Sequence, residues 1–132
     1  MKRSCGVFLH PVSLPSPFGI GDLGNDAYEW VDLLHEYSQS YWQICPLGPT
    51  GYGDSPYQSL SSFAGNALLI SPEKLYSEDL LKKSEIDQWR RPNSGRIDYG
   101  EVIDLKQKVL KLAFSRFYDS DEFHEFCEYE KA

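Results

Sequence analysis

The stretch NDAYEWVDLLHEYSQSYWQICPL, Asn25 to Leu47, joins two hydrophobic patterns and decides the fold class. Its first part, to about Gln39, repeats apolar side chains at helical spacing. Its second part, from Tyr41 onward, is a short aromatic and β-branched run that Pro and Gly cut off, which is typical of a strand. We therefore expect an amphipathic helix followed directly by a strand.

A second apolar run precedes the helix. SCGVFL (4–9) ends at a His-Pro pair and predicts a strand buried on both faces, as in a parallel sheet. Asn25 is expected as the N-cap of the helix, with Asp26 near the positive end of the helix dipole. Strand, helix and strand make a βαβ unit. Because ligands gather at the carboxyl ends of parallel strands, functional residues are expected just after each strand.

The second half of the chain carries mainly helical patterns. The run FAGNALLI (63–70) fits either a short strand or a buried connector. Ser71 and Pro72 have the pattern of an N-cap followed by Pro at the first helical position. Longer helices are expected over residues 100–118 and 121–131. The fold class is therefore α/β, with helices dominating toward the carboxyl end.

Composition and charge restrict the function classes. With 132 residues, 41% apolar and 25% charged, the chain has the composition of one ordinary globular domain. A formal net charge of −7 argues against a general attraction to nucleic acid or an anionic membrane surface. No apolar run approaches the ~20 residues of a membrane helix. We expect a neutral or cationic partner, no nucleic acid and no membrane.

Cysteine and histidine spacing argues against disulfides and metals. Cys5, Cys45 and Cys127 lie far apart without a CxxC pair, and their odd number fits poorly with a disulfide framework. We interpret them as reduced thiols, which makes the cytoplasm the simplest compartment. No two of the three histidines have the spacing of metal ligands. We expect neither a metal nor another cofactor.

The segment PLGPTGYGDSPYQS (46–59) follows the second strand and is the candidate binding loop. Its Gly and Pro content excludes a long helix or a regular central strand. Sugars are bound by polar side chains at their hydroxyls and by aromatic rings at their C–H faces. Two interpretations stay open: a carbohydrate-binding loop, or a Pro-containing turn with a packed tyrosine. The candidate binding residues are Tyr52, Asp54, Ser55, Tyr57 and Gln58.

Three longer stretches carry a family resemblance: LHPVSLPSPFGIGDLG (9–24), SYWQICPLGPTGYGDSPYQSLSSFAGNALLI (40–70) and IDYGEVIDLK (97–106). In this order they resemble the amino-terminal part of the amylomaltase family, the 4-α-glucanotransferases also called disproportionating enzyme. The resemblance implies an enzyme on a (β/α)8 barrel. It would cut an α-1,4-glucan, hold the sugar covalently and pass it to glucose or another glucan, a retaining reaction. α-1,4-Glucans, maltooligosaccharides and glucose are the implied partners.

The resemblance also implies roles within the loop. It places Tyr57, in the DSPYQ motif, against the sugar next to the cleaved bond, with Ser55 nearby. Tyr52 matches a tyrosine implicated in a secondary glucan contact in some relatives. Asp54 and Gln58 are expected to shape the loop.

A complete (β/α)8 barrel typically takes ~250 residues, so the chain is expected to form an incomplete N-terminal part of one. Residues 1–70 would hold the first βα units with a glucan-binding loop at 46–66, and residues 71–132 an inserted, mainly helical subdomain. In the family the catalytic carboxylates lie on later strands, and no residue here is assigned to catalysis. An open sheet edge would need the rest of the barrel or self-association.

Three polar residues outside the loop can be interpreted as structural and not functional residues. His10 follows the first strand and either lines the binding cleft or is an ordinary satisfied side chain. Asp22 is interpreted as a turn residue and Asp26 as a helix-start charge.

Two functions of different class remain. The first is a 4-α-glucanotransferase fragment that is inactive as the isolated chain. The alternative is a non-catalytic carbohydrate-binding or assembly module that lacks the catalytic carboxylates.

Overall fold

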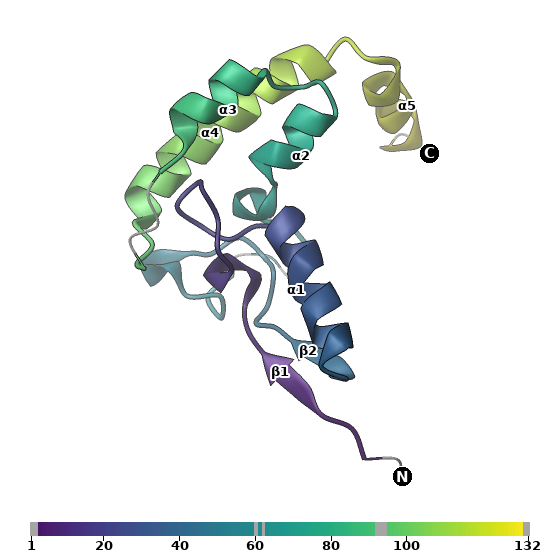
Figure 1. The fold of residues 1–132 in the computed structure, drawn as a ribbon. Coiled ribbons are helices and arrows are strands. Elements are labelled where there is room, and N and C mark those ends of the chain that lie inside the picture. The colour runs from purple at the N-terminus through teal and green to yellow at the C-terminus, as the bar shows by residue number, and fades with distance from the viewer. Residues whose placement is uncertain (1–2, 60, 62, 92–94, 131–132) are drawn as a thin grey trace.

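The computed structural model describes residues 3–59, 61, 63–91 and 95–130. Two strands and the first helix lie at one end of the molecule, and the later helices arch over the other end (Figure 1). The strands and α-helices are β1 (Gly6–Phe8), α1 (Asn25–Glu36), β2 (Tyr41–Gln43), α2 (Pro72–Ser77), α3 (Lys83–Trp89), α4 (Tyr99–Phe117) and α5 (Asp121–Glu130). Short 3-10 helices lie at Pro11–Ser13, Tyr52–Asp54 and Ala67–Leu69.

The predicted βαβ unit is present. β1 and β2 pair in parallel, with Gly6 opposite Tyr41 and Phe8 opposite Gln43, and α1 connects them. The ladder continues one residue further, because the Leu9 amide donates to the carbonyl of Gln43 at 3.0 Å. The carboxyl ends of both strands therefore face the same region of the molecule. The described part of the chain is α/β, as the sequence predicts.

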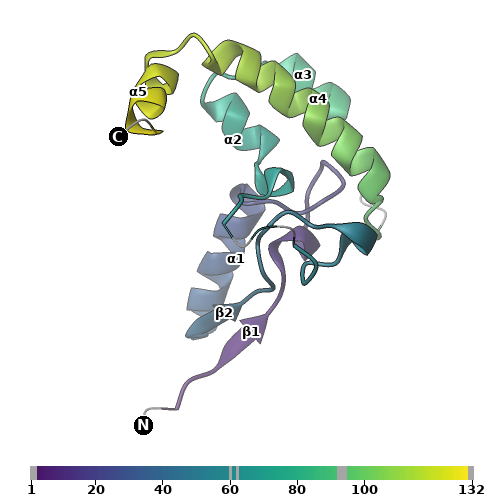
Figure 2. The ribbon, with the colours of Figure 1, turned by 180° about the vertical axis from the view of Figure 1, so that it is seen from behind.

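The strands are shorter and more exposed than the sequence predicts. Strands were expected over 4–9 and 41–47, yet each described strand spans only three residues. Burial on both faces is wrong for β1, since Phe8 is 57% exposed. In β2, Tyr41 is 65% exposed. A two-stranded sheet with one helix beside it leaves its edges and part of its surface open (Figures 1 and 2).

Helix α1 begins one residue earlier than an N-cap at Asn25 would place it, and it ends earlier than expected. The N-cap is Gly24, whose amide donates to Oδ1 of Asp22 at 3.0 Å, so Asn25 is the first helical residue and not the cap. At the other end the Gln39 amide donates to the carbonyl of Leu34 at 2.8 Å. Ser38 adopts a positive φ of 55° between them. This left-handed residue closes the helix at Glu36, in the manner of a Schellman motif.

The helical patterns of the second half are largely confirmed. The 63–70 run forms neither a strand nor a plain connector, because Ala67–Leu69 is a 3-10 turn whose Leu68 amide donates to Oδ1 of Asn66. Ser71 is the N-cap of α2 and Pro72 its first residue, although the Ser71 side chain makes no capping hydrogen bond. Helix α4 is capped by Asp98, which accepts from the Glu101 amide at 3.1 Å.

One apolar core joins the two halves. The aromatic ring of Phe18, 1% exposed, comes from the turn-rich stretch before α1 and packs among side chains of the helical half. Its buried neighbours in this cluster are Leu81, Ile86, Leu105, Val109 and Ala113. The predicted division into 1–70 and 71–132 therefore has a shared core across it.

A buried ion pair reinforces the same junction. Nζ of Lys106 on α4 lies 3.2 Å from Oδ2 of Asp22, and Lys106 is 1% exposed. The ammonium group also donates to the carbonyl of Ile70. Burial lowers the pKa of Lys106, and the Asp22 carboxylate opposes that shift. Asp22 is thus more than the turn residue predicted, since it anchors α4 to the segment before α1.

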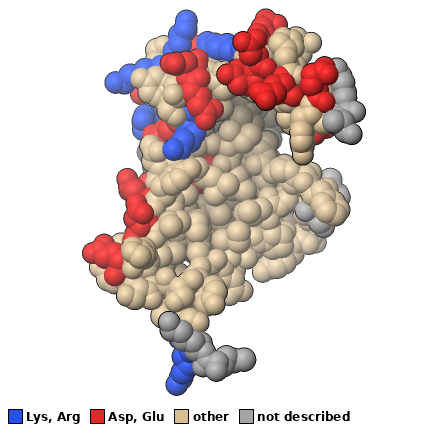
Figure 3. Space-filling model, turned by 90° about the vertical axis from the view of Figure 1, so that its right-hand side faces the viewer, with Lys and Arg blue, Asp and Glu red and all other residues tan. Residues whose placement is uncertain are grey.

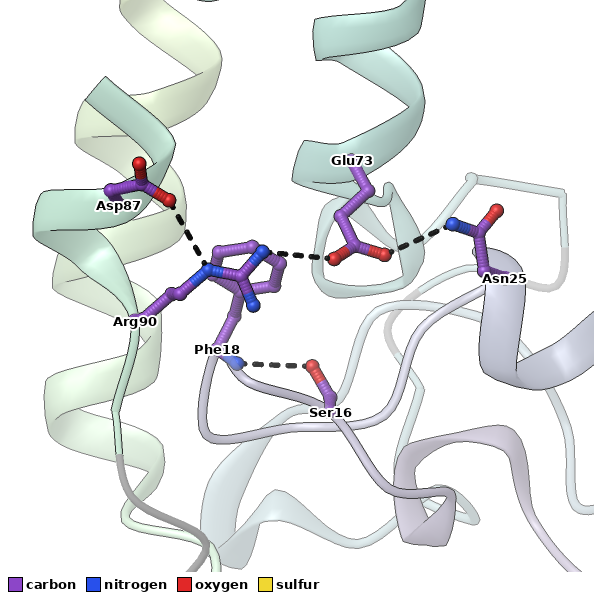
Figure 4. Close-up of polar contacts among 6 residues, drawn as sticks. All are labelled: Ser16, Phe18, Asn25, Glu73, Asp87 and Arg90. Carbon is purple, nitrogen blue, oxygen red and sulfur yellow. Dashed lines mark hydrogen bonds and ion pairs between the residues drawn. The ribbon is translucent and has the colours of Figure 1, made fainter. Parts of the chain in front are cut away.

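Arg90 links three further segments (Figure 4). Its guanidinium contacts Asp87 on α3 and Glu73 on α2, each at 3.4 Å. Glu73 in turn accepts from the Asn25 side chain at 3.3 Å, and the guanidinium carbon lies 5.7 Å from the Phe18 ring centroid. This partly exposed network ties α1, α2 and α3 together beside the core.

Helix α5 follows the end of α4 at the edge of the molecule and contributes no buried residue (Figure 2). Phe123 holds it there by packing against Phe114 and Phe117, with ring centroids 5.7 Å apart in each pair. Charged side chains gather over the helical end, while uncharged residues cover most of the middle of the face shown in Figure 3. In the described chain, no helix has the length and apolar content to cross a membrane.

Candidate functional site

The candidate loop is closed on itself at its base. It leaves the carboxyl end of β2, and Thr50 and Ser59 then form an antiparallel bridge. Next to this bridge the Gly51 amide donates to the carbonyl of Gln58 at 3.0 Å. Backbone pairing at the base fixes the direction in which the tip of the loop projects, without any helix or long strand.

Inside the bridge the backbone turns twice. The Gln58 amide donates to the carbonyl of Ser55 at 3.0 Å, and the Asp54 amide to that of Gly51 at 3.3 Å. Gly53 has φ +72°, and Asp54 also lies in the left-handed region at φ 54°. No described atom lies within 4 Å of where a Cβ of Gly53 would be, so backbone conformation and not crowding favours glycine there. The tip has a defined shape.

Tyr57 carries the exposed aromatic ring among the described side chains of the predicted set. It is 73% exposed, so its ring is available to a ligand and is not packed into the protein. Its hydroxyl oxygen accepts from the Cys45 thiol, with Sγ 3.7 Å from Oη. The hydrogen bond with Cys45, followed by the charge of that group, raises the pKa of Tyr57.

The other predicted residues share the loop but differ in exposure. Ser55 and Asp54 are partly buried, whereas Gln58 is exposed. The backbone of Tyr52 belongs to a 3-10 turn, but its side chain lies outside the part of the chain that the structure describes. The structure therefore gathers Asp54, Ser55, Tyr57 and Gln58 on one closed loop.

A small hollow lies between the loop and the strand ends. Its lining is mainly apolar, and we call it the polar hollow after the polar side chains that interrupt that lining. The register of β1 and β2, continued for two residues, puts His10 level with Cys45, and both line a hollow of about 200 Å³. Nδ1 of His10 is buried and has no hydrogen-bond partner among the described residues. Burial lowers the pKa of His10, which favours the neutral imidazole. The other residues that line the hollow are Val12, Ser13, Thr50, Asp54, Pro56, Asn66, Leu68 and Tyr99.

Tyr99 is a neighbour of the loop that the sequence analysis missed. It lines the polar hollow and, with Asp54, a shallower depression of about 690 Å³ on the outer side. Burial, and then the charge of Asp54, raises the pKa of Tyr99. Tyr99 lies within the stretch 97–106, which carried the family resemblance but to which no role was assigned. Only the folded chain brings this segment against the loop.

The site has no metal-binding cluster in the described ranges 3–59, 61, 63–91 and 95–130, where no group of three or more His, Cys, Asp or Glu residues could hold an ion. Asp22 is paired with Lys106 away from the loop. The arrangement therefore offers an exposed aromatic ring, hydroxyls, an amide and one carboxylate around a small polar hollow. Such a set can bind a neutral polyhydroxylated ligand.

Comparison with known proteins points in the same direction. The family model described as 4-alpha-glucanotransferase matches residues 9–132. A 4-alpha-glucanotransferase of Synechocystis sp. is 47% identical over 96% of this chain and 26% of its own length. The Thermus thermophilus relative is 44% identical over 89% of this chain and 23% of its own length.

A solved structure agrees with the sequence relatives. An amylomaltase from Streptococcus agalactiae, in complex with acarbose, superposes with a TM-score of 0.88 and 37% identity. The match covers 98% of this chain and 27% of that chain. The chain thus spans about a quarter of the length of the proteins it matches. Its sequence, described fold and family match together place it among known enzymes: the chain belongs to the 4-alpha-glucanotransferase family.

Proposed function

We propose that this chain supplies the donor-sugar-binding loop of a 4-α-glucanotransferase, which transfers α-1,4-glucan segments to glucose or another glucan with retention. The chain would form the amino-terminal part of a (β/α)8 barrel, with its helical half as an inserted subdomain. The observation that carries the proposal is Tyr57, which is 73% exposed on a closed loop at the carboxyl end of a parallel strand. Barrel enzymes bind their substrates at that end.

The loop residues have complementary roles in this proposal. The exposed ring of Tyr57 would stack on the C–H face of a glucose unit, and the hydroxyl of Ser55 and the amide of Gln58 would bind sugar hydroxyls. Asp54, partly buried and with a positive φ of 54°, would shape the tip. Tyr52 is proposed as a secondary glucan contact.

The transfer reaction needs carboxyl groups that the loop residues do not supply. A retaining mechanism uses two carboxyl groups roughly 5–5.5 Å apart, one as nucleophile and one as acid/base. We assign neither to this chain, because Asp22 is held by Lys106 and Asp54 is the one carboxylate lining the polar hollow in the described chain. The carboxylates would come from the remaining length of a full enzyme.

The exposed residues of the two strands suggest what the chain associates with. Phe8 and Tyr41, on the paired strands, are 57% and 65% exposed. Further barrel strands, or a second copy, would cover them. The thiols of Cys5, Cys45 and Cys127 are free, which suits the proposed cytoplasmic location.

The test is titration of the chain with maltotriose, followed by calorimetry, for the parent and Tyr57→Ala. Loss of one stacked aromatic ring should weaken binding roughly tenfold. Tyr37→Ala is the matched control, because Tyr37 is 66% exposed just after α1. Equal affinity of the Tyr57 variant and the parent would contradict the proposal.

A second candidate function, a non-catalytic carbohydrate-binding or assembly module, is favoured by the absence of an assigned carboxylate pair. Glucose release from maltotriose separates the two. We expect no release by this chain alone. Release after addition of a polypeptide carrying the rest of a related enzyme would favour the transferase, and binding without release would favour the module.

A further inference from the structure

We propose that Cys45 is a positioning residue for Tyr57, holding the phenol hydroxyl at the edge of the polar hollow while the ring stays open to sugar. The inference rests on the proposed function, because it assigns a purpose to the orientation of Tyr57 in glucan binding. Cys45, just after β2, would thereby join the loop residues in binding the ligand.

The two partners differ in rigidity. Cys45 lies two residues beyond β2, whose last residue, Gln43, accepts from the Leu9 amide. Tyr57 lies on the projecting tip of the loop and is 73% exposed, so little packing restrains its ring. A contact between them ties the hydroxyl end of the exposed Tyr57 side chain to the strand end.

The chemistry of the contact leaves the phenol able to bind sugar. The Cys45 thiol donates to the Tyr57 oxygen across 3.7 Å, so the phenolic hydrogen remains available to a ligand oxygen. A thiol is a weak and polarizable partner, and it can hold the hydroxyl without competing strongly with a sugar. The contact therefore orients the Tyr57 hydroxyl and leaves its hydrogen free to bind a ligand oxygen.

The surroundings of Cys45 support a role at the ligand. Cys45 is partly buried and lines the same hollow as His10, whose Nδ1 is buried without a partner in the described chain. Asp54 and Asn66 add polar atoms to this wall. A sugar stacked on Tyr57 would place hydroxyls near these polar atoms, so a changed angle of the Tyr57 ring would misalign their contacts.

The contact itself can be measured without a ligand. The hydrogen bond and the charge of Cys45 hold the proton on the phenol and raise the pKa of Tyr57, so loss of the contact should show in the titration of that ring. Carbon-13 labelling of the tyrosine rings, with Tyr57→Phe for assignment, follows this titration by NMR. Cys45→Ala and Cys45→Ser should both lower the Tyr57 pKa, since both remove the group that raises it. Cys5→Ala, which removes an exposed thiol, should leave it unchanged.

Binding then separates positioning from packing. In maltotriose titrations of the full chain, Cys45→Ala should weaken binding about threefold to tenfold, the value of one hydrogen bond. Cys45→Ser restores a donor and should bind within about twofold of the parent. Thermal unfolding of each variant identifies any loss caused by misfolding. Packing alone would not produce recovery with serine together with a lowered Tyr57 pKa.

Each outcome decides the proposal. An unchanged Tyr57 titration in Cys45→Ala overturns it, because the contact would then be absent. Parent-like affinity of Cys45→Ala, alongside weak binding by Tyr57→Ala, also overturns it and leaves the proposed function standing. Parent-like affinity of Tyr57→Ala contradicts the proposed function, and the positioning role falls with it even if the NMR titration reports the contact.

Discussion

Helices α3 and α4 close around an apolar core, whereas β1 and β2 leave large side chains in solvent. Val109 on α4 is 0% exposed and Ile86 on α3 is 3% exposed, but Phe8 on β1 is 57% exposed. The candidate loop is held by the Thr50–Ser59 bridge, by backbone hydrogen bonds and by the contact of Cys45 with Tyr57, whose ring is 73% exposed. The helical half thus carries much of the stability, and the strand half presents the groups suited to binding.

The largest expected effect comes from breaking the junction between these two regions. Lys106→Ala should lower the free energy of unfolding by roughly 3–5 kcal/mol, because it leaves the Asp22 carboxylate buried without its cation. Urea unfolding measures the loss, and Lys108→Ala, exposed on the same helix, is the control. If both variants unfold at the same urea concentration, the two regions are not joined through this pair.

A smaller effect is expected from a change confined to the loop. Gly53→Ala should cost about 1–2 kcal/mol, since alanine is strained at φ +72°. Gly65→Ala is matched, because an added Cβ meets open space at both positions and no positive φ is recorded for Gly65. Calorimetric unfolding and maltotriose titration should register Gly53→Ala and hardly detect Gly65→Ala. Equal behaviour would show that the loop tip is not held in its left-handed turn.

The smallest effect concerns the surface of the helical half. Two oxygens of Glu85 contact Arg116, at 2.6 and 2.8 Å, which lowers the pKa of Glu85 to about 2. A carboxylate whose folded pKa is depressed stabilises the fold above its unfolded pKa, near 4.5, and loses that contribution as pH falls toward about 2. Glu85→Gln should flatten the stability profile in this acidic window, measured by urea unfolding at several pH values. An unchanged profile would assign acid sensitivity to other carboxylates.

The helical half could be predicted because the spacing of apolar residues within each short segment is enough to indicate a helix. The stripe of Val102, Leu105 and Val109 repeats at helical spacing, and all three are buried on α4. Lys106 lies on the same buried side and could not be predicted, because a charged side chain is normally exposed. Its partner Asp22 is distant in sequence and is found only by folding.

The site was predictable in kind but not in detail. Gly and Pro identified 46–59 as an irregular loop, and the βαβ pattern predicted its place after β2. The contact of Cys45 with Tyr57, and the approach of Tyr99 to the loop, depend on side-chain geometry that no spacing rule encodes. The sugar-binding roles of Tyr57 and Ser55 stay predictions.

The insertion of Phe18 into the helical core bears on the order of events during synthesis. The ring is 1% exposed and packs with Val109, yet it is translated long before α4. At roughly 5–20 residues per second, several seconds separate the two on the ribosome. During that interval the nascent segment carries an aromatic ring that its helical partners do not yet cover, and transiently exposed apolar surface of this kind favours aggregation.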